Sequence, residues 1–249
     1  MPQGNVYIGT SGWNYRHWEG RFYPQGLKQK NWFNYYARYF NTVEINNTFY
    51  HLPQKEVFEN WNRSSPDHFL FVVKASRFIT HMKKLKDPQE STRNFLENAS
   101  GLGSKIGPVL FQLPPFWNLD LERLKSFAHY ITHQQIIPDL KVALELRNPT
   151  WVQQEVFEVL QNYNLALCFA DWPELPIEEP VTADFIYLRR HGPSSLYASC
   201  YSQQQLWQDA EKIIDWRNQG KDVFVYYNND AQAWAVENAL TLMQMVEDH

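Results

Sequence analysis

Charged side chains interrupt apolar runs at several points in this sequence. Glu44 and Glu145 lie inside runs of Val, Ile, Leu and Ala, where an unpaired charge is costly to bury. Lys74, Arg147 and Arg189 end or follow such runs, and their cationic groups can pair with carboxylates or bind a phosphate. The pattern predicts a site for an anionic ligand, with a purely structural network of ion pairs as the alternative.

A larger set of polar and aromatic residues stands at the same ends of the apolar runs, whereas the opposite ends are plain. The candidate catalytic residues are Glu44, Glu145, Asp171, Lys74 and His191. The candidate ligand-binding residues are Ser11, Trp13, Asn46, Tyr50, Arg77, His81, Gln112, Arg147, Arg189, Asn228, Asn229 and Asp230. If the runs are strands of a parallel barrel, these residues gather at its C-terminal mouth and form the site.

These residue types suit more than one function. Two carboxylates drawn from Glu44, Glu145, Asp171 and Asp230 could serve a glycosidase-like hydrolase as acid and base or as acid and nucleophile. Lys74 could form a Schiff base, as in a lyase, if burial lowers its pKa. A non-enzymatic binding or partner-docking protein is a further alternative, so the sequence leaves open whether this protein is an enzyme.

The sequence contains no metal or cofactor signature. His81 and His191 are the histidines near strand ends, and neither belongs to a His-x-x-x-His pair. Cys168 and Cys200 lack Cys-x-x-Cys spacing. The chain has no Gly-x-Gly-x-x-Gly loop, Walker loop or Gly-x-Ser-x-Gly elbow. We therefore expect no metal site and no cofactor.

Short apolar runs rich in Val, Ile, Leu and Phe are the elements that would position these residues. The sequence predicts eight strands, at Val6–Gly9, Thr42–Ile45, Phe69–Lys74, Pro108–Gln112, Lys141–Leu146, Leu165–Ala170, Phe185–Leu188 and Val223–Tyr227. Several runs are apolar at successive positions, which is typical of strands that are covered on both faces.

Amphipathic helical patterns separate most of these runs, with apolar stripes over residues 32–40, 121–131, 152–163, 206–214 and 236–246. Asp87-Pro88 and Asn148-Pro149 predict helix starts, because proline is favoured at the first helical position. Ser202 with Gln205 fits a capping box, and Gly220 predicts the end of a helix.

Alternating strands and helices predict an α/β fold, either closed as a barrel or open and doubly wound. Eight strands in 249 residues favour a single TIM-type (β/α)8 barrel domain over residues 1–249. The crossover between strands six and seven carries Pro173, Pro176 and Pro180 without helical periodicity, so we expect it to lack a helix.

The composition of the chain limits the classes of ligand that we expect. The net charge of −4 is unusual for a protein that tracks nucleic-acid phosphates, so a nucleic-acid end is a possible but not a favoured ligand. A small anionic molecule is the favoured partner. The first residues show no signal-peptide pattern and no apolar run is long enough to span a bilayer, so we expect a cytoplasmic protein with no membrane contact. The oligomeric state is not indicated.

Several strings along the chain resemble one known family. Ile8-Gly-Thr-Ser-Gly-Trp13, continuing to Trp18-Glu-Gly-Arg-Phe-Tyr-Pro24, is similar to the opening of the domain-of-unknown-function 72 family, the YecE-like proteins. Further matches are Val43-Glu-Ile-Asn46, Thr48-Phe-Tyr50, Lys74-Ala, Thr80-His81, Gly107-Pro, Leu110-Phe-Gln-Leu-Pro-Pro115, Glu145-Leu-Arg147, Tyr187-Leu-Arg-Arg-His-Gly192 and Asn228-Asn-Asp230. The resemblance implies a TIM-type barrel and a set of site positions, but no particular reaction.

The departures from the family pattern are mild. Tyr227 stands where the family suggests Phe, and Ala233-Trp234 replaces a glycine–aromatic pair. The long aromatic segment Trp13–Pro24 is weakly helical, and we interpret it as a lid over the strand ends, with a hydrophobic plug as the alternative.

Overall fold

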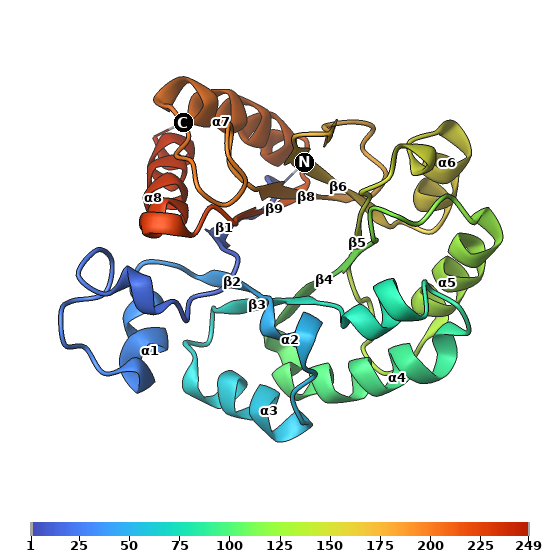
Figure 1. Ribbon diagram of the computed structural model, residues 1–249, viewed down its shortest axis with the longest axis horizontal. Helices are drawn as coiled ribbons and strands as arrows, with labels where there is room; N and C mark the ends of the chain where they lie inside the picture. Colours follow the sequence, from blue (N-terminus) through green and yellow to red (C-terminus); the bar gives the residue numbers. More distant parts are fainter. Residues whose placement is uncertain (1, 249) are drawn as a thin grey trace. The chain divides into compact units, whose positions relative to one another are not determined.

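The computed structural model describes residues 2–248 and contains the eight strands expected from the sequence (Figure 1). Their bounds are β1 Val6–Thr10, β2 Thr42–Ile45, β3 Leu70–Lys74, β4 Ile106–Gln112, β5 Val142–Glu145, β6 Ala166–Trp172, β8 Phe185–Arg190 and β9 Asp222–Tyr227. The predicted bounds are right to within two residues because each run is apolar over nearly its whole length.

Helices follow most of the strands. The α-helices are α1 Trp32–Tyr36, α2 Asn47–Tyr50, α3 Lys55–Ser64, α4 Pro88–Ala99, α5 Leu121–His133, α6 Gln154–Asn162, α7 Gln203–Asn218 and α8 Trp234–Glu247. Short 3-10 helices are η1 Arg16–Trp18, η2 Gln29–Asn31, η4 Ser100–Lys105, η5 Pro149–Trp151 and η6 Ala231–Ala233, and η3 Phe78–Met82 is a π-helix.

The predicted helix signals have mixed outcomes. Pro88 is the first residue of α4, and the capping box of Ser202 and Gln205 opens α7, as predicted. The start predicted at Asn148-Pro149 is corrected, because these residues open η5 and α6 begins only at Gln154. The Asn148 side chain accepts from the Thr150 backbone N–H, and the chain leaves helical geometry at Val152.

The chain divides into two compact units, which are described separately. The first comprises residues 2–44, 169–178 and 184–248. In it β9 pairs in parallel with both β1 and β8, and a parallel bridge joins Ser11 to Glu44. Helices α7 and α8 pack against each other and against β9 (Figure 1).

The crossover predicted to lack a helix contains none. Residues 173–184 instead include the short strand β7, Leu175–Ile177, which pairs antiparallel with β6. The sequence did not predict this strand, because three residues containing a proline give no readable alternation.

The second unit comprises residues 45–168 and 179–183. Strand β4 pairs in parallel with β3 and β5, and the first residues of β6 pair with β5. Side chains at successive strand positions are buried, such as Val109, Leu110 and Phe111 in β4. Burial at consecutive positions means that both faces of these strands are covered, which is why their sequence reads as a continuous apolar run.

Residues 2–248 include no helix whose length and apolar character would let it cross a lipid bilayer.

Candidate functional site

The first unit contains a buried group that we call the Glu44 cluster: Ser11, Glu44, Tyr187 and Arg189. Glu44 belongs to β2, Ser11 follows β1, and Tyr187 and Arg189 share one face of β8 because side chains alternate along a strand. A Cβ atom on Gly9 would lie 2.6 Å from the Thr42 carbonyl oxygen. The glycine therefore permits the close approach of β1 to β2 that brings Ser11 beside Glu44.

Every oxygen of the Glu44 carboxylate accepts hydrogen bonds. Arg189 donates from Nε to Oε2 at 3.0 Å and from Nη2 to Oε1 at 2.8 Å, which is a bidentate ion pair. Tyr187 Oη donates to Oε2 at 2.6 Å, and the Ser11 hydroxyl donates to Oε1. Glu44, Tyr187 and Arg189 have no exposed surface. Burial and the nearby Glu44 charge raise the pKa of Tyr187 well above its usual value. The cluster therefore holds its charges in balance away from solvent.

Tyr187 was not predicted as a site residue. Its position two residues before Arg189 places it on the same strand face, and this spacing is the signal that could have identified it.

A second group in the first unit surrounds Asp171 near the end of β6. Asp171 Oδ1 accepts from the backbone N–H of His191 at 2.7 Å, and its other oxygen accepts from Tyr201 Oη. The His191 ring is buried, and its Nδ1 lies 3.2 Å from Asn228 Nδ2. Burial and the Asp171 charge raise the pKa of Tyr201, so its hydroxyl stays a donor. Asp171, His191 and Asn228 are therefore brought together as predicted neighbours, with Tyr201 as an unpredicted member.

Arg190 points away from the Glu44 cluster because it is the next residue along β8. Its Nε donates to Asp209 Oδ2 at 2.8 Å, and Nη2 donates to Oδ1. This buried pair ties β8 to α7, so it is best described as structural. Tyr201 and Asp209 lie on elements distant in sequence from their partners, and no local pattern could have identified them.

In the loop after β9, Asn229 and Asp230 have different surroundings. Asn229 is fully buried, and its amide donates to the Ser199 carbonyl at 2.8 Å and to Asn238 Oδ1 at 2.9 Å. Asn229 thus fixes the loop, which is typical of a structural residue. Asp230 lies 3.3 Å from His17 Nε2, and burial raises the pKa of its carboxyl.

The segment Trp13–Pro24 is packed into the first unit by its aromatic side chains. Trp18 and Tyr23 are fully buried, and Trp18 Nε1 donates to the Asp230 carbonyl at 2.9 Å. The Trp13 ring packs edge-on against Phe33, with 5.4 Å between ring centroids. Buried anchors of this kind favour the plug interpretation over a lid that opens readily.

The second unit contains a group with three cationic side chains, which we call the cation cluster: Lys74, Arg77, His81 and Arg147. Lys74 is the last residue of β3, His81 lies in η3, and Arg147 follows β5. Lys74 is 9% exposed, and its ammonium nitrogen lies 4.5 Å from the centroid of the Phe49 ring. The same ring contacts His81 edge-on, with 5.0 Å between centroids.

The potential in the cation cluster is positive. Burial, together with the charges of Lys74, Arg147 and Arg77, lowers the pKa of His81 to about 4. His81 is therefore neutral at pH 7. Its Nδ1 lies 2.9 Å from the Thr80 hydroxyl, which helps to fix the ring. Phe49 was not predicted as a site residue, although it stands between Thr48 and Tyr50 in a quoted motif.

The remaining predicted residues of the second unit lie around these cations. Arg147 donates to Glu145 from both Nε and Nη2, and Glu145 is fully buried. Gln112 is the register partner of Glu145 at the end of β4. Asn46 precedes α2, and Tyr50 at the end of α2 is 72% exposed.

Over residues 2–248, no three His, Cys, Asp or Glu side chains lie close enough together to hold a metal ion.

Comparison with known proteins identifies relatives of this chain. The family model described as "Protein of unknown function DUF72" matches residues 7–249. The chain is 23% identical to the UPF0759 protein YunF of Bacillus subtilis, over 97% of this chain and 95% of that protein. It is 30% identical to the UPF0759 protein YecE of Escherichia coli K12, over 58% of this chain and 49% of that protein.

Solved structures extend the similarity. A crystal structure of a DUF72 family protein from Thermotoga maritima is 28% identical, covers 98% of this chain and 99% of its own, and gives a TM-score of 0.86. Together with the alternation of parallel strands and helices, this similarity confirms the predicted fold class, a TIM-type (β/α)8 barrel. The chain belongs to the DUF72 family, to which the YecE-like proteins also belong.

Proposed function

We propose that this protein binds a small anionic ligand, carrying a phosphate or carboxylate group, at the cation cluster. The observation that supports this most directly is the positive potential at His81, created by Lys74, Arg147 and Arg77 on three neighbouring segments. An anion placed there would gain Coulomb attraction from several cations at once, and a partly buried setting screens that attraction less than bulk water does.

The roles of the individual cations follow from their surroundings. Lys74 has little freedom because its ammonium is held over the Phe49 ring, so it supplies a fixed positive charge. Arg77 is exposed and can move to meet a ligand. Arg147 is oriented by Glu145, which holds its guanidinium in a fixed direction. Gln112, beside Glu145 in register, offers a neutral donor.

The contacts of the carboxylates favour binding over acid–base catalysis. Glu44 is bound by Arg189, Tyr187 and Ser11, and a carboxylate held this way is a poor proton donor or base. Asp171 accepts on both oxygens, and Glu145 is paired with Arg147. These contacts weigh against a glycosidase-like pair. The Lys74–Phe49 contact favours the charged amine and so weighs against a Schiff-base role.

Calorimetric titration tests the proposal. Pyrophosphate and citrate, added separately at low ionic strength, are expected to bind and to lose affinity as salt is raised. Lys74→Met is expected to lower the affinity about tenfold, the equivalent of losing roughly 1.4 kcal/mol of attraction. The matched control is Lys125→Met, which removes one charge from the surface of α5, where Lys125 pairs with Glu122.

The calorimetric results distinguish binding at the cation cluster from the absence of such binding. Similar affinity in the wild type and Lys125→Met, with a loss of about tenfold in Lys74→Met, supports the proposal. No binding of either probe at millimolar concentration, or equal loss in both variants, would overturn it.

A further inference from the structure

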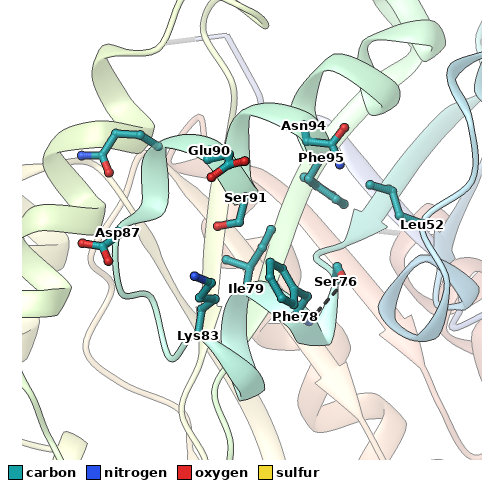
Figure 2. Close-up of a pocket in the computed structure, with 11 residues that line it drawn as sticks. Leu52, Ser76, Phe78, Ile79, Lys83, Asp87, Glu90, Ser91, Asn94 and Phe95 are labelled. Atoms are coloured by element: carbon teal, nitrogen blue, oxygen red, sulfur yellow. Dashed lines mark hydrogen bonds between the residues drawn. The ribbon is translucent and has the colours of Figure 1, made fainter.

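A cavity of about 580 Å³ lies in the second unit, beside η3 and the first half of α4 (Figure 2). Its volume lies in the range of about 300–1,000 Å³ that is usual for small-molecule sites. Leu52, Ile79 and Phe95 supply apolar surface to its wall. None of the residues in the Glu44 cluster or the cation cluster lines it.

The backbone that forms one wall has an unusual conformation. Residues 78–82 form the π-helix η3, and such helices recur at functional sites. Immediately after it, Lys84, Leu85 and Asp87 have φ angles of 50°, 58° and 45°. Left-handed conformations in residues other than glycine are strained, and strain of this kind collects where ligands bind.

Polar side chains line the α4 side of the cavity. Ser91 Oγ is buried without a hydrogen bond, and Figure 2 shows Ser91 on the side of α4 that faces Ile79. Asp87 and Glu90 are exposed at the start of α4, where their carboxylates face solvent. Asp87 precedes α4, yet its side chain does not cap the helix. Helix capping therefore does not explain the position of the Asp87 carboxylate.

Charge and ring geometry define what the cavity would recognise. Two carboxylates face one ammonium, that of Lys83, so the lining charge is negative. Glu90, one of these two carboxylates, lies in the first turn of α4, beside the positive end of the helix. The Lys83 ammonium lies 5.7 Å from the centroid of the Phe78 ring, and Phe78 is 44% exposed. This ring face thus already receives a cation from the protein itself.

We propose that this cavity is a binding site for a small planar aromatic molecule that carries a protonated amine. The ring of the ligand packs on Ile79, Phe95 and Leu52, where it leaves water. Its ammonium group lies near Asp87 and Glu90, and it displaces Lys83 from the Phe78 face. Ser91 gains the hydrogen-bond partner that it lacks. The site is separate from the one in the proposed function.

Two probes that share the same indole ring but carry opposite charges test this proposal. Tryptamine and indole-3-acetate are titrated calorimetrically into the wild-type protein. Tryptamine is expected to bind at least tenfold more tightly than indole-3-acetate, because only the amine complements the carboxylates. Equal affinity for the two probes, or no binding of tryptamine at millimolar concentration, would overturn the proposal.

Three variants locate the binding. Glu90→Gln is expected to weaken tryptamine binding about fivefold, and Lys83→Met to strengthen it several-fold because a competing cation is gone. Glu97→Gln, the same change at an exposed position of α4 outside the cavity, is the control and should leave the affinity unchanged. Thermal unfolding of each variant without ligand verifies folding. If Glu90→Gln and Lys83→Met both bind like the wild type, tryptamine binds elsewhere and the proposal fails.

Discussion

The Glu44 cluster and the cation cluster contain similar types of residue but differ in their charge balance. In the Glu44 cluster, one carboxylate meets one guanidinium, and hydroxyl groups of Tyr187 and Ser11 complete its hydrogen bonds. In the cation cluster, burial and three positive groups lower the pKa of His81 to about 4. Both groups lie at the carboxyl ends of strands, so position alone does not distinguish structural charges from binding charges.

The difference lies in charge balance and access. A buried pair with all its hydrogen bonds made contributes to stability only while both partners remain, because removing one leaves a buried charge. A cluster with excess charge and an exposed member such as Arg77 carries repulsion that a ligand of opposite charge relieves. Substitutions in the first group should therefore act on folding, and those in the second on binding.

The largest effect is expected for Glu44→Gln. It leaves the Arg189 guanidinium buried without its counter-charge and should lower the free energy of unfolding by about 3–5 kcal/mol. Urea unfolding measures this, with the exposed Glu237→Gln on α8 as the control. A loss below about 1 kcal/mol would show that the cluster tolerates imbalance and would break the comparison.

Tyr187→Phe should have a smaller effect of the same kind. It removes the 2.6 Å hydrogen bond to the Glu44 carboxylate, and a bond to a charged acceptor contributes roughly 2 kcal/mol. The free energy of unfolding is measured beside that of Tyr39→Phe, where the lost hydroxyl is exposed and the expected change is within about 0.5 kcal/mol. Similar losses in the two variants would contradict the role of Tyr187.

The titration of His81 tests the cation cluster. Burial and the three cations hold its pKa at about 4, below the ordinary value of 6.5. Between these values the unfolded chain binds a proton that the folded protein does not, so stability falls as pH falls from 6.5 to 4.

NMR titration of the His81 ring measures this pKa directly. Lys74→Met should move it upward toward its ordinary value, because one of the opposing charges is gone. His81→Gln should remove this part of the acid dependence of stability. An unchanged pKa in Lys74→Met would show that the Lys74 charge does not contribute to the shift.

The smallest effect on stability is expected for Arg77→Gln. Arg77 is exposed, so the free energy of unfolding should change by no more than about 0.5 kcal/mol. Affinity for pyrophosphate should nevertheless fall several-fold, because one cation is missing. Stability lost without any loss of affinity would reverse the assignment of the two clusters.

Much of the fold was readable from the sequence. Strands such as β4 and β9 are buried on both faces, so they appear as unbroken apolar runs with distinct ends. The polar groups of Glu44, Asp171 and Arg147 could be placed at those ends for the same reason. The short elements α2 and β7 were missed, because three or four residues do not establish a period.

The partners of the site residues were much less predictable. Tyr187 was within reach, since strand alternation puts it beside Arg189. Tyr201, in the loop before α7, lies 30 residues from Asp171, and Asp209, on α7, lies 19 residues from Arg190. The cavity lies beside a π-helix that left-handed residues follow, and Lys84 and Leu85 give no signal of this conformation in the sequence.

The sequence by itself determined the order and type of the strands and the ends that carry charge, because the period and length of an apolar run are local properties. Only the tertiary structure decided that Glu44 is neutralised while His81 sits among cations. That distinction depends on which side chains meet across different elements and how much water they keep, and neither property is encoded within a single segment.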